Sequence, residues 1–286
     1  MVCEMFSWIL LSLVHAQPCN DYQRPKLLLR VNAEELLESS GLAPSQVRPN
    51  VFYSHNDSGS DAAVFGFSTQ GGRVEKWPLN QLGAEDWEDM ASGPCPLNGE
   101  SKCLFIGDIG DNLRRREHVQ IYAIPESANG PQNKVVGTWS LAYPNGPEDA
   151  ETLLVHPKTG RVYVVTKRSQ RPAVYRAPQH PTSGKWDLVA TLDEERMGLR
   201  IPKLTGGDFS ADGKRVVLRG YLGAWEWDVD LMDSEKHWRE PPSRRVPIRL
   251  ERQGEAITYG ASGAIFTSSE GRPMPLTRIG CGGGNH

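Results

Sequence analysis

One acidic stretch of the chain, residues 86–112, has the residue types and spacing of a cation site. It begins with Asp86, Glu88 and Asp89, three carboxylates within four residues, and it closes with Asp108 and Asp111. Between the two groups lie a loop with proline and glycine and an apolar run with strand character. If the two flanking strands pair antiparallel, the end of one lies beside the start of the other, and the acidic groups meet. Carboxylate oxygens gathered in this way suit a hard cation such as Ca²⁺.

A spacing that recurs along the chain predicts a repeated β unit with a period of roughly 50 residues. In each unit a repeat anchor stands six residues before a proline or alanine, and a turn and a β-rich run follow it. The anchors are Glu38, Glu88, Glu151, Thr205 and Glu255. A third short run follows in every unit, and a fourth follows in most, such as Val246–Leu250 in the fourth unit. Four strands in each of five units predict an all-β fold, a five-bladed β-propeller. A six-bladed propeller is the alternative, and it requires the long unit at 81–145 to split.

The two ends of the chain predict how the propeller closes. The fifth unit ends after the run Pro275–Ile279 and lacks a fourth strand, whereas the run Lys26–Val31 belongs to no unit. A propeller closes when such an N-terminal strand joins the last blade, which also covers an exposed edge. Antiparallel pairing of the two runs brings Cys19 near Cys281.

The cysteines agree with this closure. Cys95 and Cys103 stand on either side of one loop, at a separation that suits a bridged hairpin, and no pair has the CxxC spacing of a zinc site. We therefore predict the disulfides Cys19–Cys281 and Cys95–Cys103, which are typical of exported proteins. The first of them closes nearly the whole chain and is expected to matter more to stability.

The N-terminus and the bulk composition predict an exported, monomeric protein. A short apolar run at 6–14 and the small residues Val14 and Ala16 match a secretory signal peptide at 1–16; a disordered or buried N-terminus is the alternative. One propeller domain at 17–281 and a flexible glycine-rich tail at 282–286 follow. The 286 residues carry a net charge of −3, which gives no reason to expect nucleic acid or an acidic membrane surface as partner. No later apolar run is long enough to span a bilayer.

The predicted site lies where the channel of the propeller opens, because the anchors and the ends of the second strands meet there. Several carboxylates in such a place cannot all stay ionised without a cation, protonation or basic neighbours. The predicted metal ligands, with Ca²⁺ as the preferred ion, are Glu88, Glu151, Glu255, Asp57, Asp108 and Asp111. The predicted ligand-binding residues are His55, Asn56, Lys167, Arg219 and Glu270. His55 and Asp57 are candidates for general acid and base on a bound ligand. A salt-bridged network that plugs the channel is the structural alternative.

Familiar catalytic motifs are absent from the sequence. It has no GxSxG nucleophile elbow, no HExxH zinc motif and no Walker A phosphate loop. The chemistry of any enzyme built on this chain would therefore depend on the acidic groups described above.

Six short motifs carry a resemblance to a known family. They are His55-Asn56-Asp57-Ser58-Gly59, Asp86-Trp87-Glu88-Asp89, Gly107-Asp108-Ile109-Gly110-Asp111-Asn112, Asp149-Ala150-Glu151, Thr205-Gly206-Gly207-Asp208 and Gln253-Gly254-Glu255-Ala256. From about residue 38 to 270, the chain resembles a family of secreted bacterial β-propeller proteins and is similar to the TolB-like propeller group. The resemblance implies a propeller in the cell envelope or outside the cell, but it names no reaction. Thr205 replaces the glutamate of the fourth unit, which leaves that side of the site for a ligand.

Two functions follow from these observations. The first is a secreted or periplasmic propeller that binds a small molecule or an envelope protein at an acidic, calcium-binding channel mouth. The second is a metal-dependent hydrolase of a small ester, lactone or phosphate. The sequence leaves open whether the protein is an enzyme.

Overall fold

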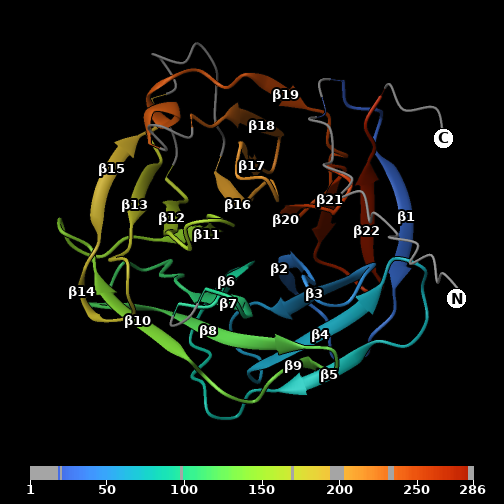
Figure 1. The fold of residues 1–286 in the computed structure, drawn as a ribbon, viewed down its shortest axis with the longest axis horizontal. Coiled ribbons are helices and arrows are strands. Elements are labelled where there is room, and N and C mark those ends of the chain that lie inside the picture. Colours follow the sequence, from blue (N-terminus) through green and yellow to red (C-terminus); the bar gives the residue numbers. More distant parts are fainter. Residues whose placement is uncertain are drawn as a thin grey trace, which may run out of the picture.

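Five β-sheets stand around a central axis in the computed structural model, which describes residues 19, 21–96, 99–168, 171–193, 203–230 and 235–282 (Figure 1). Each sheet is one blade of a β-propeller, and its strands follow one another antiparallel from the axis outward. The five-bladed prediction is confirmed, and the six-bladed alternative is wrong, because the unit at 81–145 forms a single sheet.

The first strand of each blade lies next to the axis. These strands are β2 (Ser39–Pro44), β6 (Trp87–Pro94), β11 (Ala150–Val155), β16 (Leu204–Phe209) and β20 (Gly254–Tyr259). Each contacts the first strand of the next blade, and β20 contacts β2, so the ring is closed. With the exception of Pro44, every residue of these strands is buried.

The remaining strands complete the blades outward. Blade one continues with β3 (Val51–Asn56), β4 (Ala63–Ser68) and β5 (Glu75–Pro78), and blade two with β7 (Lys102–Asp108), β8 (Val119–Ser127) and β10 (Gly137–Ala142). Blade three continues with β12 (Val162–Thr166), β13 (Ala173–Arg176) and β15 (Asp187–Thr191), and blade four with β17 (Arg215–Gly220), β18 (Gly223–Asp228) and β19 (Arg244–Val246). Blade five continues with β21 (Ile265–Ser269), β22 (Met274–Ile279) and β1 (Lys26–Val31).

Local sequence explains the hairpins and some of the strand ends. Gly160 and Gly213 have φ of +65° and +72° in the turns between the first and second strands of blades three and four. Only glycine adopts this conformation at little cost. The fourth strand of blade four was expected at 246–250, but it ends at Val246, because Pro247 has no N–H for the ladder.

Three small elements were not predicted. Strand β9 (Gly130–Pro131) pairs with β8, and β14 (Ser183–Lys185) pairs parallel with β10 at the outer edge of blade two. A 3-10 helix, η1 (Lys236–Arg239), lies beside β15. All three are too short to leave a periodic pattern in the sequence.

The core lies between neighbouring blades. The cluster between blades two and three, for example, unites Phe105, Trp139 and Val164, with the first two rings 6.0 Å apart. Facing apolar sheets of this kind supply most of the stabilisation of the fold.

The closure of the ring agrees with the prediction. Strand β1 pairs antiparallel with β22, and Val31 stands opposite Met274 (Figure 1). The Cys19–Cys281 bond lies just beyond this pair, with Cα atoms 5.4 Å apart, and the Cys95–Cys103 bond closes its hairpin at 5.0 Å. Both predicted disulfides are confirmed.

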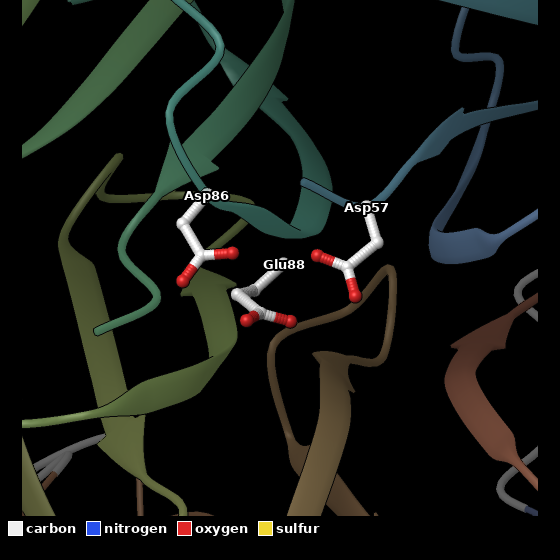
Figure 2. A group of neighbouring side chains, drawn as sticks. All are labelled: Asp57, Asp86 and Glu88. Carbon is white, nitrogen blue, oxygen red and sulfur yellow. The ribbon is translucent and has the colours of Figure 1, made fainter. Parts of the chain in front are cut away.

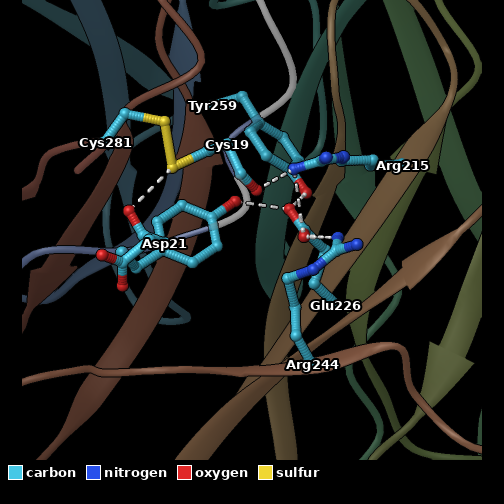
Figure 3. Close-up of a disulfide and its surroundings, with 8 residues drawn as sticks. Cys19, Asp21, Arg215, Glu226, Arg244, Tyr259 and Cys281 are labelled. Carbon is cyan, nitrogen blue, oxygen red and sulfur yellow. Dashed lines mark hydrogen bonds and ion pairs between the residues drawn. A yellow bond between two sulfur atoms is a disulfide. The ribbon is translucent and has the colours of Figure 1, made fainter. Parts of the chain in front are cut away.

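A buried group of polar side chains, which we call the closure hub, lies beside the first disulfide (Figure 3). Its members are Tyr22, Arg215, Glu226, Arg244 and Tyr259. The Glu226 carboxylate accepts hydrogen bonds from both tyrosine hydroxyls and forms ion pairs with both arginines. Arg215 also donates to the carbonyl oxygen of Cys19. The hub therefore ties blade four to the segment that closes blade five.

Each first strand has an irregular register near its start. In β6, β11 and β16 the pairing slips by one residue around Glu88, Glu151 and Thr205. The same irregularity spans Ser40 in β2 and Glu255 in β20. The anchor of blade one is therefore Ser40, and the prediction of Glu38 is wrong. Glu38 is exposed and precedes the strand, because the loop before β2 follows a path set by the Asn56 side chain.

Several predictions concern parts of the chain that the structure does not describe. The signal peptide at 1–16 and all but the first residue of the tail at 282–286 lie outside the described residues. Within the described ranges, no helix has the length and apolar character that a membrane crossing requires.

A carboxylate cluster as candidate functional site

Five carboxylates from three blades form the cluster that we call the carboxylate cluster: Asp57, Asp86, Glu88, Asp149 and Glu151. The two glutamates are the second residues of β6 and β11, where the register slips. Such bulges re-aim side chains and are common beside functional sites. Asp86 and Asp149 immediately precede these strands, and Asp57 follows β3. The loops and strand starts of blades one, two and three thus meet at one end of the ring.

The cluster consists of two overlapping groups. Carboxylate oxygens of Asp57, Asp86 and Glu88 lie within 4.8 Å of one another, and so do those of Glu88, Asp149 and Glu151. Figure 2 shows the first group, in which the three carboxylates point toward a common centre. Glu88 belongs to both groups and is the central side chain of the cluster.

Gly110, in the loop after β7, permits the close packing of these carboxylates. A Cβ atom at this position would lie 2.4 Å from Oε1 of Glu88 and 2.5 Å from Oδ2 of Asp86. The Gly110 N–H also donates to the Asp86 carbonyl oxygen at 3.1 Å. Any other residue would force the two carboxylates to move.

Positive charge in the cluster is scarce. Lys167 forms an ion pair with Oε1 of Glu151, and its ammonium lies 5.8 Å from the Tyr221 ring centroid. Glu88 is only 4% exposed, yet no described residue donates a hydrogen bond to its carboxylate. Glu151 is 2% exposed, and its Oε2 has no hydrogen-bond partner. A buried carboxylate oxygen without a donor is costly, so Oε2 of Glu151 indicates a missing positive partner.

The raised pKa values of the cluster also indicate that a positive partner is missing. Burial, followed by the charges of Asp57 and Asp149, raises the pKa of Asp86 to about 6. Burial and the charges of Asp57 and Asp86 raise the pKa of Glu88 well above its usual range. Each shift shows that, without a cation, the protein disfavours the ionised form.

Glu255 and Glu270 lie near the cluster but in neither group. Burial raises the pKa of Glu255 to about 7, although Lys167 opposes the shift. Burial also raises the pKa of Glu270, and the charges of Glu38 and Asp57 add to the effect. The predicted metal ligand Glu255 and the predicted ligand-binding residue Glu270 thus share the electrostatic surroundings of Lys167.

Asp108 and Asp111 have other partners. Asp108 forms an ion pair with Arg116 at 2.8 Å and accepts a backbone hydrogen bond from Asp86. Oδ2 of Asp111 accepts the backbone N–H groups of Arg115 and Arg116. The loop after β7 folds back on these strand-end aspartates, so neither belongs to the two groups. Asp108 and Asp111 thus fit the alternative prediction of a structural network of salt bridges and hydrogen bonds better than that of a metal site.

Three other predicted residues lie inside the protein. The His55 ring is fully buried edge-on to Trp87, Nδ1 is 2.9 Å from the Asn56 carbonyl oxygen, and burial lowers its pKa. The Asn56 side chain bonds to the backbone of residues 35, 37 and 38. Arg219 is buried between blades four and five and donates to the carbonyl oxygens of Ala256 and Ser268.

Asp86, Asp149 and Tyr221 are not among the predicted metal ligands or ligand-binding residues, although Asp86 begins the acidic stretch from which the site was predicted. A signal for the two aspartates existed, because each stands two residues before an anchor glutamate in the pattern Asp-x-Glu. Tyr221 lies in the turn between β17 and β18, where no such pattern marks it. Burial and the nearby carboxylates of Glu255 and Glu270 raise its pKa.

The donor set of the cluster fits a hard divalent cation. All its donors are carboxylate oxygens, which Ca²⁺, Mg²⁺ and Mn²⁺ prefer over softer metals. Oxygens bound to one Ca²⁺ at 2.3–2.6 Å lie at most about 5 Å apart, which matches the spacing within each group.

Comparisons with known proteins show the fold. The sequence matches no protein-family model and no curated protein. The structure is similar to a PQQ-bound aldose sugar dehydrogenase from Streptomyces coelicolor, with a TM-score of 0.52 and 9% identity over 92% of this chain and 99% of that chain. It is also similar to an auxiliary nutrient binding protein from Bacteroides thetaiotaomicron, with a TM-score of 0.50 and 9% identity over 91% and 77% of the two chains. At this identity, the comparisons show that the chain has the fold of a β-propeller.

Proposed function

We propose that the protein is a secreted or periplasmic propeller that binds a small molecule or an envelope protein through a divalent cation held by the carboxylate cluster. The observation that carries this proposal is Glu88. The residue is 4% exposed, and its carboxylate lies within 4.8 Å of two other carboxylates on either side and receives no hydrogen bond from the described residues. A side chain in this position is explained by a cation that it coordinates.

Two other ways to balance the cluster are weaker. Lys167 is the basic group paired with it, and one ammonium does not compensate five carboxylates. Protonation would neutralise Asp86 only below about pH 6. A bound divalent cation would remove the repulsion among the carboxylates at neutral pH, without further basic side chains and without protonation.

Calcium is the preferred ion because the ligands are oxygens alone. Ca²⁺ accepts six to eight oxygen ligands in flexible geometry, whereas Mg²⁺ demands a near-ideal octahedron. Each group offers three carboxylates, so coordination positions remain for water or for oxygen atoms of a ligand. When bound, the cation would provide a positive centre that an oxygen-rich ligand can coordinate.

Export is supported by the two disulfides. Such bonds persist in oxidising compartments and are rare in the cytosol. The signal-peptide pattern at 1–16 points to the same location. Assignment to the TolB-like propeller group is part of this proposal and depends on the motif resemblance.

Calorimetry with Ca²⁺ and with chelator tests the proposal. We expect a binding heat and a higher melting temperature with Ca²⁺, and a lower melting temperature after chelation. Glu151→Gln should weaken both effects, whereas Glu117→Gln, on an exposed loop of blade two, should change neither. If the melting of the wild-type protein is indifferent to Ca²⁺, Mg²⁺ and Mn²⁺ alike, the proposal is wrong.

A hydrolase remains the second candidate because open coordination positions in the cluster would suit metal-assisted hydrolysis. Asp57 is half-exposed beside them and keeps its suggested role as a base, whereas the burial of His55 makes it unsuitable. A screen of esters, lactones and phosphate esters with the Ca²⁺-loaded protein decides this point. Activity that Asp57→Asn abolishes would favour the enzyme, and a blank screen would favour the binding protein.

A further inference from the structure

The carboxylate cluster is too wide for one cation. Two donors of one Ca²⁺ lie at most about 5 Å apart. Asp57, Asp86 and Glu88 meet this limit, and so do Glu88, Asp149 and Glu151, but the five residues do not form a single group. Each group therefore fits its own cation, and Glu88 is common to both.

The formal charges agree with two ions. The cluster has five carboxylates, and the ammonium of Lys167 offsets one of them. Four negative charges remain, which equals the charge of two divalent cations. One cation would leave two negative charges in a largely buried place, where uncompensated charge is costly.

Each group contains a buried glutamate with at least one oxygen that lacks a donor. No described residue donates a hydrogen bond to the Glu88 carboxylate, and Oε2 of Glu151 has no hydrogen-bond partner. Both residues are at least nine-tenths buried. Glu88 belongs to both groups and Glu151 to the second alone, so one ion bound in the first group would still leave Oε2 of Glu151 without a partner.

We propose that the carboxylate cluster is a two-cation centre in which Glu88 bridges the ions, one oxygen to each. Asp57 and Asp86 complete one site, and Asp149 and Glu151 complete the other. A bridging carboxylate of this kind places two ions about 3.5–4 Å apart. The inference rests on the proposed function in one respect, because it requires that the cluster bind a cation at all.

The number of bound ions tests the inference directly. Chelated protein is dialysed to equilibrium against saturating Ca²⁺, and elemental analysis gives the ions bound per chain. We expect two for the wild-type protein and two for Glu117→Gln. One ion per chain would overturn the two-cation centre and leave the proposed function standing, and none would overturn both.

Variants at the two ends of the cluster test which residues bind which cation. Asp57→Asn and Asp149→Asn should each reduce the count from two to one, because each removes a charged ligand of a different site. A double variant should bind none at the same free Ca²⁺. If either single variant still binds two ions with unchanged affinity, the assignment is wrong.

Glu88→Gln tests the bridge. Because both ions share this ligand, the substitution should weaken both by roughly tenfold or more, since ligand charge sets the affinity of such sites. If one ion stays bound with wild-type affinity, Glu88 does not bridge. Circular dichroism and the mass of the oxidised chain check that the variant folds; if it does not, the two aspartate variants still decide the count.

Discussion

The carboxylate cluster and the closure hub both bury glutamates, but only the hub surrounds its glutamate with positive charges and hydrogen-bond donors. Glu226 of the hub is fully buried and receives two arginines and two tyrosine hydroxyls. Glu88 of the cluster is almost as buried, but its nearest partners are other carboxylates. The charge of the hub glutamate is therefore balanced within the protein, whereas that of the cluster would be balanced by the cation that we propose.

The difference follows from where the two regions lie. The hub joins blade four to the closing segment near Cys19, so its task is structural. Its two arginines are matched by Glu226 and by Asp228, which pairs with both of them. The cluster lies at the starts of β6 and β11, where register shifts direct side chains out of the regular ladder. A buried carboxylate that the protein supplies with donors therefore indicates a structural role, whereas one without donors indicates a binding site.

The largest expected effect concerns the covalent part of the closure. Replacement of Cys19 and Cys281 together by serine should lower the free energy of unfolding by about 5 kcal/mol, because the bond restricts a very long loop in the unfolded chain. The pair Cys95 and Cys103 closes a separation of 8 residues instead of 262, and its loss should cost only about 2.5 kcal/mol. Urea denaturation measures both. Equal losses would contradict the loop-length account.

The next effect removes the charge at the centre of the hub. Glu226→Gln should destabilise the protein by about 3 kcal/mol, because it removes the buried counter-charge of Arg215 and Arg244 and leaves them only the exposed carboxylate of Asp228. Urea denaturation in chelator isolates this effect from cation binding. A substitution without consequence would show that the arginines find other partners.

Calcium should stabilise the wild-type protein and leave the hub unaffected. At a free concentration 100 times the dissociation constant, the expected gain is about 2.7 kcal/mol per site. The Glu226→Gln variant should gain as much as the wild-type protein, since its cluster is intact. Scanning calorimetry at matched Ca²⁺ concentrations makes the comparison. A smaller gain in the hub variant would mean that the two regions are coupled.

In chelator, removal of a glutamate charge from the cluster should raise the stability of the protein, whereas its removal from the hub should lower it. In chelator, Glu88→Gln should stabilise the protein by about 1 kcal/mol or less, because it removes a buried negative charge that Asp57 and Asp86 repel. With Ca²⁺ the same variant should be less stable than the wild-type protein. If Glu88→Gln destabilises the chelated protein as Glu226→Gln does, the cluster is a balanced structural network.

The smallest effect is a dependence of stability on pH. Asp86 and Glu255 have pKa values raised to about 6 and about 7, above those of the unfolded chain. Their contribution is therefore fully present below about pH 4 and is lost as the pH rises through about 6 to 7. The contribution of Asp86 is small because this residue is half-exposed and water screens its charge, so most of the decline comes from the buried Glu255. Melting temperatures in chelator between pH 4 and 8 should show this decline, and saturating Ca²⁺ should flatten it.

The fold was predictable because the same sequence pattern occurs five times along the chain. Five units with the same order of anchor, turn and β-rich run predict the blades, and the spare strand Lys26–Val31 predicts the closure. The anchor of blade one was misplaced because Glu38 has the expected residue type and Ser40 does not. Ser40 and Thr205 share a role that residue type conceals: each hydroxyl donates to the backbone of the neighbouring anchor, Glu88 or Glu255.

The site was predictable in its location and only partly in its members. Glu88, Glu151 and Asp57 come together as expected, since antiparallel pairing brings strand starts and ends to one place. Asp108 and Asp111 do not join them, because the loop that carries Arg116 folds back on both. Whether a carboxylate faces a neighbouring arginine or an open position depends on loop conformation, and residue spacing does not encode it.

The pairing of β1 with β22 also sets an order of events during synthesis. Strand β1 leaves the ribosome before every other described strand, and its partner leaves after all of them. Until then β1 has no partner and its unpaired edge is a template for wrong association. Cys19 must likewise wait as a thiol while Cys95 and Cys103 emerge and pair within their own hairpin. The bond between Cys19 and Cys281 joins the two sides of the closure, so it is a chemical mark of a closed ring.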